Sequence, residues 1–180
     1  MEAIRKIMGS RQIMQDKAFT KDNLEKEFAA HEYGIAHIST HGYFGGTPDE
    51  TDLQVYPDDK LPLDDLERLV SLGRFREEPL ELMVLSACQT ALGDERAALG
   101  LGGVAVKAGA RRAIATLWSV NDDSTSELLT EFYRNLKTPE RMSAAKALQA
   151  AQKKFVSRKD KPRYAHPFYW APFLLIGSWL

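Results

Sequence analysis

Two residues in this sequence have types that can together perform covalent catalysis: His41 and the only cysteine, Cys88. A thiol with an ordinary pKa of about 8.5 is mostly protonated at neutral pH, so a nearby base or imidazolium must expose the thiolate nucleophile. Each of the two residues directly follows a short apolar segment, at 35–40 and 81–87. We therefore expect both at the carboxyl ends of strands, the edge at which open parallel sheets bind ligands.

The placement of these residues suggests a catalytic dyad. Neighbouring strands lie about 4.8 Å apart, so an imidazole and a thiol at adjoining strand ends can approach each other. Gly42 lacks a β-carbon and can bring its amide close to a substrate, so the amides of Gly42 and Cys88 are candidates for an oxyanion hole. The pattern leaves a second interpretation open, because a free cysteine at a strand end is commonly a small buried core residue.

The elements that must position these residues alternate between helical and strand patterns. Thr20 is a good N-cap for a helix that runs to about Ala30, and Gly109 is a good C-cap for a helix that starts at 99. The alternation predicts an α/β fold with a mainly parallel sheet covered by helices. Helices are expected at 2–8, 21–30, 63–72, 99–108, 124–136 and 138–155, and strands at 35–40, 53–56, 81–87, 113–118 and 173–176.

The composition restricts the class of protein. The 180 residues, 44% hydrophobic and 27% charged, are typical of one globular domain, which we place over residues 1–180. A net charge of -1 argues against a nucleic-acid partner. No apolar stretch reaches the roughly 18 to 20 residues of a spanning helix, and the amino terminus lacks a signal-peptide core. We therefore expect no membrane association and a cytoplasmic location.

A metal site is not expected. A single cysteine cannot form a multi-thiolate site. His37 and His41 have the spacing of some zinc ligands, but on a strand they lie about 13 Å apart, too far to share an ion. We expect His37 to be a hydrogen-bonded structural residue, and the same of His31 and His166.

A glycine-rich segment at 100–105 (GLGGVA) is the main competing motif. It formally fits the dinucleotide-binding fingerprint with alanine in the last place. In that motif the first glycine directly follows a strand, whereas residues 89–99 intervene here. We interpret these glycines as allowing a helix to pack closely against the sheet.

Three further residues are candidates for substrate binding. Asp122 and Asp123 follow the strand expected at 113–118, and a carboxylate there would favour a basic substrate side chain. An equally supported alternative is a role at the start of the next helix, where negative charge is favourable. Trp118 is expected to pack at the floor of the cleft. The basic segment 153–163 is expected to be a solvated connection.

Residues 39–44 (STHGYF) and 85–91 (LSACQTA) resemble the two signature blocks of the CHAT domain, a caspase-like cysteine peptidase module often joined to tetratricopeptide repeats. The resemblance covers nearly the whole chain and implies a caspase-like three-layer α/β/α sandwich. It also implies that His41 acts as general acid and base and Cys88 as nucleophile, without a metal or an organic cofactor. Further similar blocks lie, in the family's order and spacing, at 109–112, 117–122, 132–133, 147–152 and 166–173.

The function implied by the resemblance is hydrolysis of peptide bonds in protein substrates, regulated by attached tetratricopeptide repeats or another partner. The alternative is a catalytically silent module that transmits a signal to such a partner. The presence of both His41 and Cys88 argues against this alternative. The family's domain normally begins with a strand upstream of the helix expected at 2–8, so we expect this chain to lack its amino-terminal strand.

Overall fold

The computed structural model describes residues 2–9, 12–44, 50–72, 79–89, 95–138 and 142–178, and for residues 44, 87–89 and 95–100 it describes the backbone alone. By its contacts the chain divides into two units. The first unit comprises Met1–Ile13, Val120–Leu175 and Trp179–Leu180, and the second comprises Met14–Ser119 and Ile176–Ser178. The two candidate catalytic residues both belong to the second unit.

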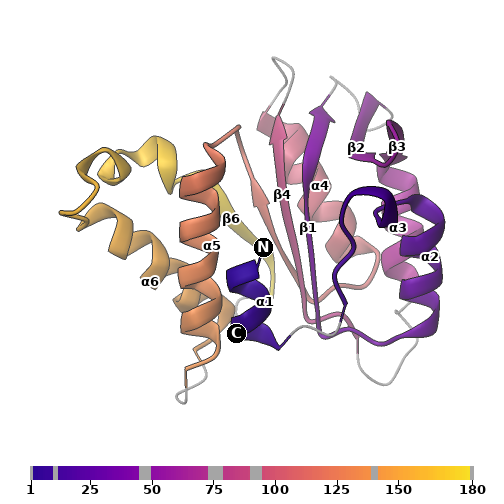
Figure 1. Ribbon diagram of the computed structural model, residues 1–180, viewed down its shortest axis with the longest axis horizontal. Helices are drawn as coiled ribbons and strands as arrows, with labels where there is room; N and C mark the ends of the chain where they lie inside the picture. The colour runs from indigo at the N-terminus through magenta and orange to yellow at the C-terminus, as the bar shows by residue number, and fades with distance from the viewer. Residues whose placement is uncertain are drawn as a thin grey trace. The chain divides into compact units, whose positions relative to one another are not determined.

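The described residues form a sheet of six strands (Figure 1). The strands are β1 (Ile35–Phe44), β2 (Thr51–Val55), β3 (Asp59–Pro62), β4 (Leu82–Gln89), β5 (Arg112–Thr116) and β6 (Phe173–Gly177). Their order in the sheet is β3-β2-β1-β4-β5-β6. β1, β4 and β5 run parallel, whereas β2 and β3 form an antiparallel hairpin beside β1. This mainly parallel sheet confirms the predicted α/β fold and is consistent with a caspase-like α/β/α sandwich.

In the second unit, three helices share a core with one face of the sheet. They are α2 (Lys21–Ala30), α3 (Leu63–Ser71) and α4 (Glu95–Lys107), and a short 3-10 segment, η1 (Asp16–Ala18), precedes them. α3 is amphipathic, with buried leucines three residues apart along it. The core joins leucines of α2, α3 and α4 to Ile38 of β1 and to Met83 and Leu85 of β4. The alternation of side chains along a strand places these three residues on one face.

In the first unit, α5 (Asp122–Leu136) packs against both α1 (Glu2–Met8) and α6 (Ala144–Val156). Two short 3-10 segments, Pro162–Ala165 and Pro167–Tyr169, follow α6. The Gln152 amide on α6 donates hydrogen bonds to the carbonyl oxygens of Trp170 and Phe173, each at 3.1 Å, and so ties the helix to the segment that leads into β6. Among the described residues, no helix combines the length and the apolar character that a membrane span requires.

Three helix starts differ from those predicted, and the smallest difference is that of α5, which begins at Asp122 rather than at 124. α4 begins at Glu95 rather than at 99. α6 begins at Ala144 and not at 138, because Ser143 is its N-cap and accepts a hydrogen bond from the Lys146 amide at 3.4 Å. The Thr138 hydroxyl instead donates to the carbonyl of Asn135 at 3.0 Å and closes α5. Residues 139–141, part of the helix predicted at 138–155, lie outside the described part of the chain.

Most residues of the basic segment 153–163 are exposed, as predicted, but Arg158 is half-buried. The Arg158 side chain is 19% exposed. Its guanidinium lies 5.5 Å from the ring centroids of both Phe155 and Tyr164, and it pairs with Glu127 and with Asp160. An arginine stem and planar head can cover aromatic rings while the charge keeps its partners. Arg158 is therefore part of the packing of the first unit.

Candidate active site

The two candidate catalytic residues lie opposite each other in the sheet of the second unit. The parallel strands β1 and β4 keep one register from Ile35 opposite Leu82 to Gly42 opposite Gln89. Within this register, His41 is the partner of Cys88. Backbones of neighbouring strands lie about 4.8 Å apart. The tertiary structure thus brings together two positions that are far apart in the sequence.

Both strands continue past the residues at which we predicted them to end. β1 runs to Phe44 rather than Thr40, and β4 runs to Gln89. The extension of β1 has a nonlocal cause, since residues 42–44 pair in antiparallel register with β2, which gives their backbone groups partners. His41 and Cys88 are therefore residues of paired strands, close to the carboxyl ends, rather than residues beyond those ends.

The side chain of His41 is exposed near the carboxyl end of β1. Ser39, His41 and Tyr43 are exposed, whereas Ile38 and Gly42 are buried, as the two-residue period of a strand requires. Ile38 belongs to the core beneath α2, α3 and α4. The imidazole of His41 is therefore accessible to solvent and to a substrate.

A hydrogen-bonded pair joins β1 to β4 just before the candidate dyad. His37 Nε2 and Ser86 Oγ lie 3.3 Å apart. Burial lowers the pKa of His37 to about 4, so its imidazole is neutral at physiological pH. This bond agrees with the expectation that His37 is a hydrogen-bonded structural residue. His37 and His41 lie on the same strand, which keeps their backbones about 13 Å apart.

Ser86, which the sequence analysis did not single out, lies next to the candidate dyad. It is buried, and it is the register partner of Ser39 on β1. It precedes Cys88 by two residues in β4. The sequence signal for its position is its place two residues before Cys88 in a strand of period two.

Gly42 lies inside the sheet. It is buried and has register partners on both neighbouring strands, Leu53 in β2 and Gln89 in β4. Its position next to His41 is the one that the sequence indicated. The use of the Gly42 and Cys88 amides as an oxyanion hole stays a prediction.

The three candidate substrate-binding residues belong to different units: Trp118 to the second, Asp122 and Asp123 to the first. Trp118 follows β5 and is partly exposed. Asp122 and Asp123 form the exposed first turn of α5, where negative charge is favourable. The N-cap is Asn121, whose Oδ1 accepts from the amides of Asp123 and Ser124 at 3.1 and 3.3 Å. The role of all three candidates in substrate binding stays a prediction.

The glycine-rich segment lies inside a helix. α4 begins at Glu95, so Gly100 does not occupy the strand-to-helix turn of a dinucleotide-binding motif. A Cβ atom at Gly102 would lie 2.4 Å from Ile176 Cδ1 and 3.4 Å from Ala115 Cβ. This close approach confirms, for Gly102, that the glycine allows the helix to pack tightly against neighbouring strands.

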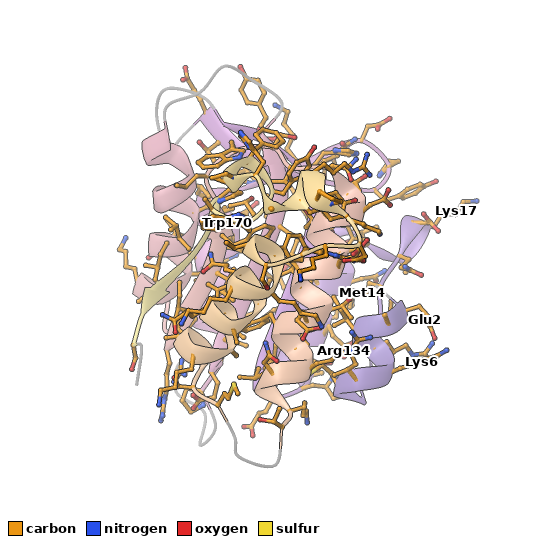
Figure 2. All side chains as sticks on the ribbon, turned by 90° about the vertical axis from the view of Figure 1, so that its left-hand side faces the viewer. Glu2, Lys6, Met14, Lys17, Arg134 and Trp170 are labelled. Atoms are coloured by element: carbon orange, nitrogen blue, oxygen red, sulfur yellow. The ribbon has the colours of Figure 1, made fainter. Side chains whose placement is uncertain are left out.

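A cavity of about 720 Å³ in the first unit is lined by residues of other types than the His41–Cys88 pair. Its charged side chains pair with one another: Glu131, for example, contacts Lys154 at 2.8 Å and Arg134 at 3.4 Å. Arg134 is labelled on α5 in Figure 2. The described lining contains neither histidine nor cysteine, so it supplies no thiol and no imidazole base. It consists of Ala3, Ser126, Glu127, Thr130, Glu131, Arg134, Lys154, Phe155, Ser157, Arg158, Lys159 and Asp160.

The family of the chain follows from a comparison with models of protein families, in which residues 1–178 match the CHAT domain. A comparison with curated proteins finds no match. The family match spans His41, Cys88 and every described strand, and it agrees with the mainly parallel α/β fold. The chain therefore belongs to the CHAT domain family, which is related to the caspase-like cysteine peptidases.

Proposed function

We propose that the protein is a cysteine endopeptidase that hydrolyses peptide bonds of protein substrates through a dyad of His41 and Cys88. The observation that carries the proposal is the register pairing of these residues on neighbouring parallel strands. Membership of the CHAT family supports it. The exposure of His41 supports it as well, because a general acid and base must reach the substrate.

In the proposed reaction, the Cys88 thiolate bonds to the scissile carbonyl carbon, and the π electrons of the carbonyl move to its oxygen. The amides of Gly42 and Cys88 donate hydrogen bonds to this oxyanion. The C–N bond then breaks, and His41, which holds the thiol proton, protonates the leaving amine. Neutral His41 next deprotonates a water molecule, and the resulting hydroxide attacks the thioester carbonyl carbon. The C–S bond breaks, which releases the acyl group as a carboxylic acid and restores the Cys88 thiolate beside the His41 imidazolium; the acid then gives its proton to solvent.

The remaining parts of the proposal concern the substrate and its regulation. Trp118 lines the substrate site. An attached domain, such as tetratricopeptide repeats, or a separate partner regulates the activity. We place the protein in the cytoplasm, where a reducing environment keeps a single thiol available as a nucleophile.

Cleavage of a proteome-derived peptide library tests the dyad. The protein is compared with Cys88→Ala, His41→Ala and, as a matched control, His31→Ala. His31 is an exposed histidine of the same unit whose Nδ1 contacts Glu27 at 3.1 Å. We expect new peptide termini, read by mass spectrometry, to vanish in the first two variants and to persist in the control.

Alkylation of Cys88 provides a second measurement that needs no substrate. If His41 stabilises the thiolate, iodoacetamide labels Cys88 rapidly at pH 7, and His41→Ala slows the labelling by about tenfold or more. His31→Ala leaves the rate unchanged. Equal labelling rates in all three proteins, together with the absence of cleavage that depends on Cys88, would refute the proposal in favour of a catalytically silent module.

A further inference from the structure

The exposed face of β1 continues past His41 onto the hairpin of β2 and β3. Tyr43 follows His41 by two residues, shares its face and is 47% exposed. The register partner of Tyr43 on β2 is Asp52. Opposed residues of antiparallel strands share a face of the sheet. An aromatic ring and a carboxylate therefore adjoin each other beside the proposed general acid and base.

The ammonium group of Lys60, on β3, contacts both the Tyr43 ring and the Asp52 carboxylate. Its Nζ lies 5.5 Å from the centroid of the Tyr43 ring and 2.9 Å from Asp52 Oδ2. The Asp52 side chain is 14% exposed, whereas that of Lys60 is 68% exposed. An aromatic face next to a carboxylate is a combination that binds organic cations. An exposed lysine pair adds little stability, so another cation can displace Lys60.

The order of the strands indicates which part of a substrate meets this pair. The order β4-β1-β2 leads from Cys88 through His41 to Asp52. In the proposed reaction, the cysteine bonds to the carbonyl carbon and the histidine protonates the leaving amine. A substrate that crosses the strands in this order brings the residues after the scissile bond to β2. By strand geometry, Tyr43 and Asp52 lie roughly 7 to 8 Å from His41, about two extended residues away.

The charge of the hairpin also favours a cation. Residues 50–62 contain four carboxylates and one lysine. Two of these carboxylates have contacts elsewhere: Asp58 accepts from the Gln54 amide at 3.2 Å, and Asp59 lies 3.7 Å from Lys21. An excess of carboxylates raises the local concentration of cationic ligands.

We propose that Tyr43 and Asp52 form a cation subsite for a lysine or arginine side chain just after the scissile bond, and that Lys60 fills this subsite in the free protein. The inference rests on the proposed peptidase function. Lys60 is an internal competitor, which the basic side chain of a substrate replaces.

Cleavage of matched peptides tests the cation subsite. Peptides that differ only in carrying Lys, Gln or Glu at the first or second position after a cut that depends on Cys88 are compared by kcat/KM. We expect the Lys peptide to exceed the Glu peptide by at least about fivefold. Asp52→Asn lowers the preference for Lys over Gln by about fivefold, and Lys60→Met raises it by about threefold. The control is Lys17→Met, which removes an exposed charge of η1 (Figure 2) and leaves the preference unchanged.

A binding measurement separates the subsite from the peptidase reaction. In the Cys88→Ala variant, the ring signals of Tyr43 are followed by NMR and assigned by comparison with Tyr43→Phe. The probes are Nα-acetyl-lysine amide, Nα-acetyl-glutamine amide and Nα-acetyl-glutamate amide at constant ionic strength. We expect saturable shifts with the lysine compound only, with binding about threefold tighter after Lys60→Met and about fivefold weaker after Asp52→Asn.

The cleavage and binding experiments distinguish failure of the cation subsite from failure of the peptidase proposal. Equal shifts with the lysine and glutamine compounds, or weaker binding of the lysine compound after Lys60→Met, overturn the cation subsite even if peptides are cleaved. A preference for the glutamate compound overturns it too and makes Lys60 an anion contact. Shifts selective for lysine without any cleavage that depends on Cys88 support the cation site and refute the peptidase proposal alone.

Discussion

Mild acid should destabilise the folded chain through His37. Burial lowers the pKa of His37 to about 4 from its ordinary value of 6.5. Between these pH values the unfolded chain binds a proton at this residue and the folded chain does not. The free energy of unfolding therefore falls as pH decreases through this window, by about 1.4 kcal/mol per pH unit. Across the window the loss amounts to about 3 kcal/mol, a large part of the stability of a small domain.

Urea unfolding between about pH 7 and pH 4.5 measures this loss. His37→Gln can still hydrogen-bond to Ser86 but cannot titrate, so the wild-type protein should lose about 2 to 3 kcal/mol more than this variant over that range. The difference between the two proteins removes the contribution of the carboxylates, which they share. Ser86→Ala should keep the pH dependence of the wild type, because burial rather than the bond lowers the pKa. If the difference in unfolding free energy between the wild type and His37→Gln stays constant within about 0.5 kcal/mol from pH 7 to pH 4.5, the reasoning is refuted.

Two further substitutions test the local geometry. Gly177 has φ of 98°, and a Cβ atom there would lie 2.6 Å from the carbonyl oxygen of Arg111, so Gly177→Ala should cost about 2 kcal/mol or more in thermal unfolding. Gly34→Ala, where no heavy atom lies within 4 Å of the added Cβ, should change stability by less than about 1 kcal/mol. Asn121→Ala removes the cap of α5 and should cost about 1 kcal/mol in urea unfolding, most of which Asn121→Ser should restore. A loss in Asn121→Ser as large as that in Asn121→Ala would contradict the capping role.

Elements whose signals lie within a few residues were predicted well. Thr20 caps α2 as expected, since its Oγ1 accepts from the Asn23 amide at 3.2 Å. Gly109 has φ of 122°, as its predicted place after a helix requires. The start of α6 was predicted wrongly, because Thr138 followed by proline resembles a helix start although Thr138 closes the preceding helix. Thr138 and Ser143 are both residue types that can cap a helix start, but only Ser143 caps α6.

The extent of the strands and the contents of the site depended on distant partners. β1 extends to Phe44 because β2 pairs with its end, and no pattern within β1 announces that pairing. Ser86 joins the site through His37 on the neighbouring strand. The cation subsite needs Tyr43 and Lys60 to meet across β2, which depends on the register of a hairpin. None of these contacts follows from the residue types alone.

The sequence by itself determined the α/β class and the two candidate catalytic residues, His41 and Cys88. Hydrophobic periodicity is a local property, and so is the presence of one thiol after an apolar segment. Only the tertiary structure decided that these residues are register partners and that a ring, a carboxylate and an ammonium group gather beside them. Strand register cannot be determined locally, because it is set by pairing between segments that are distant in the sequence. A shift of one residue would turn every side chain of a strand to the other face.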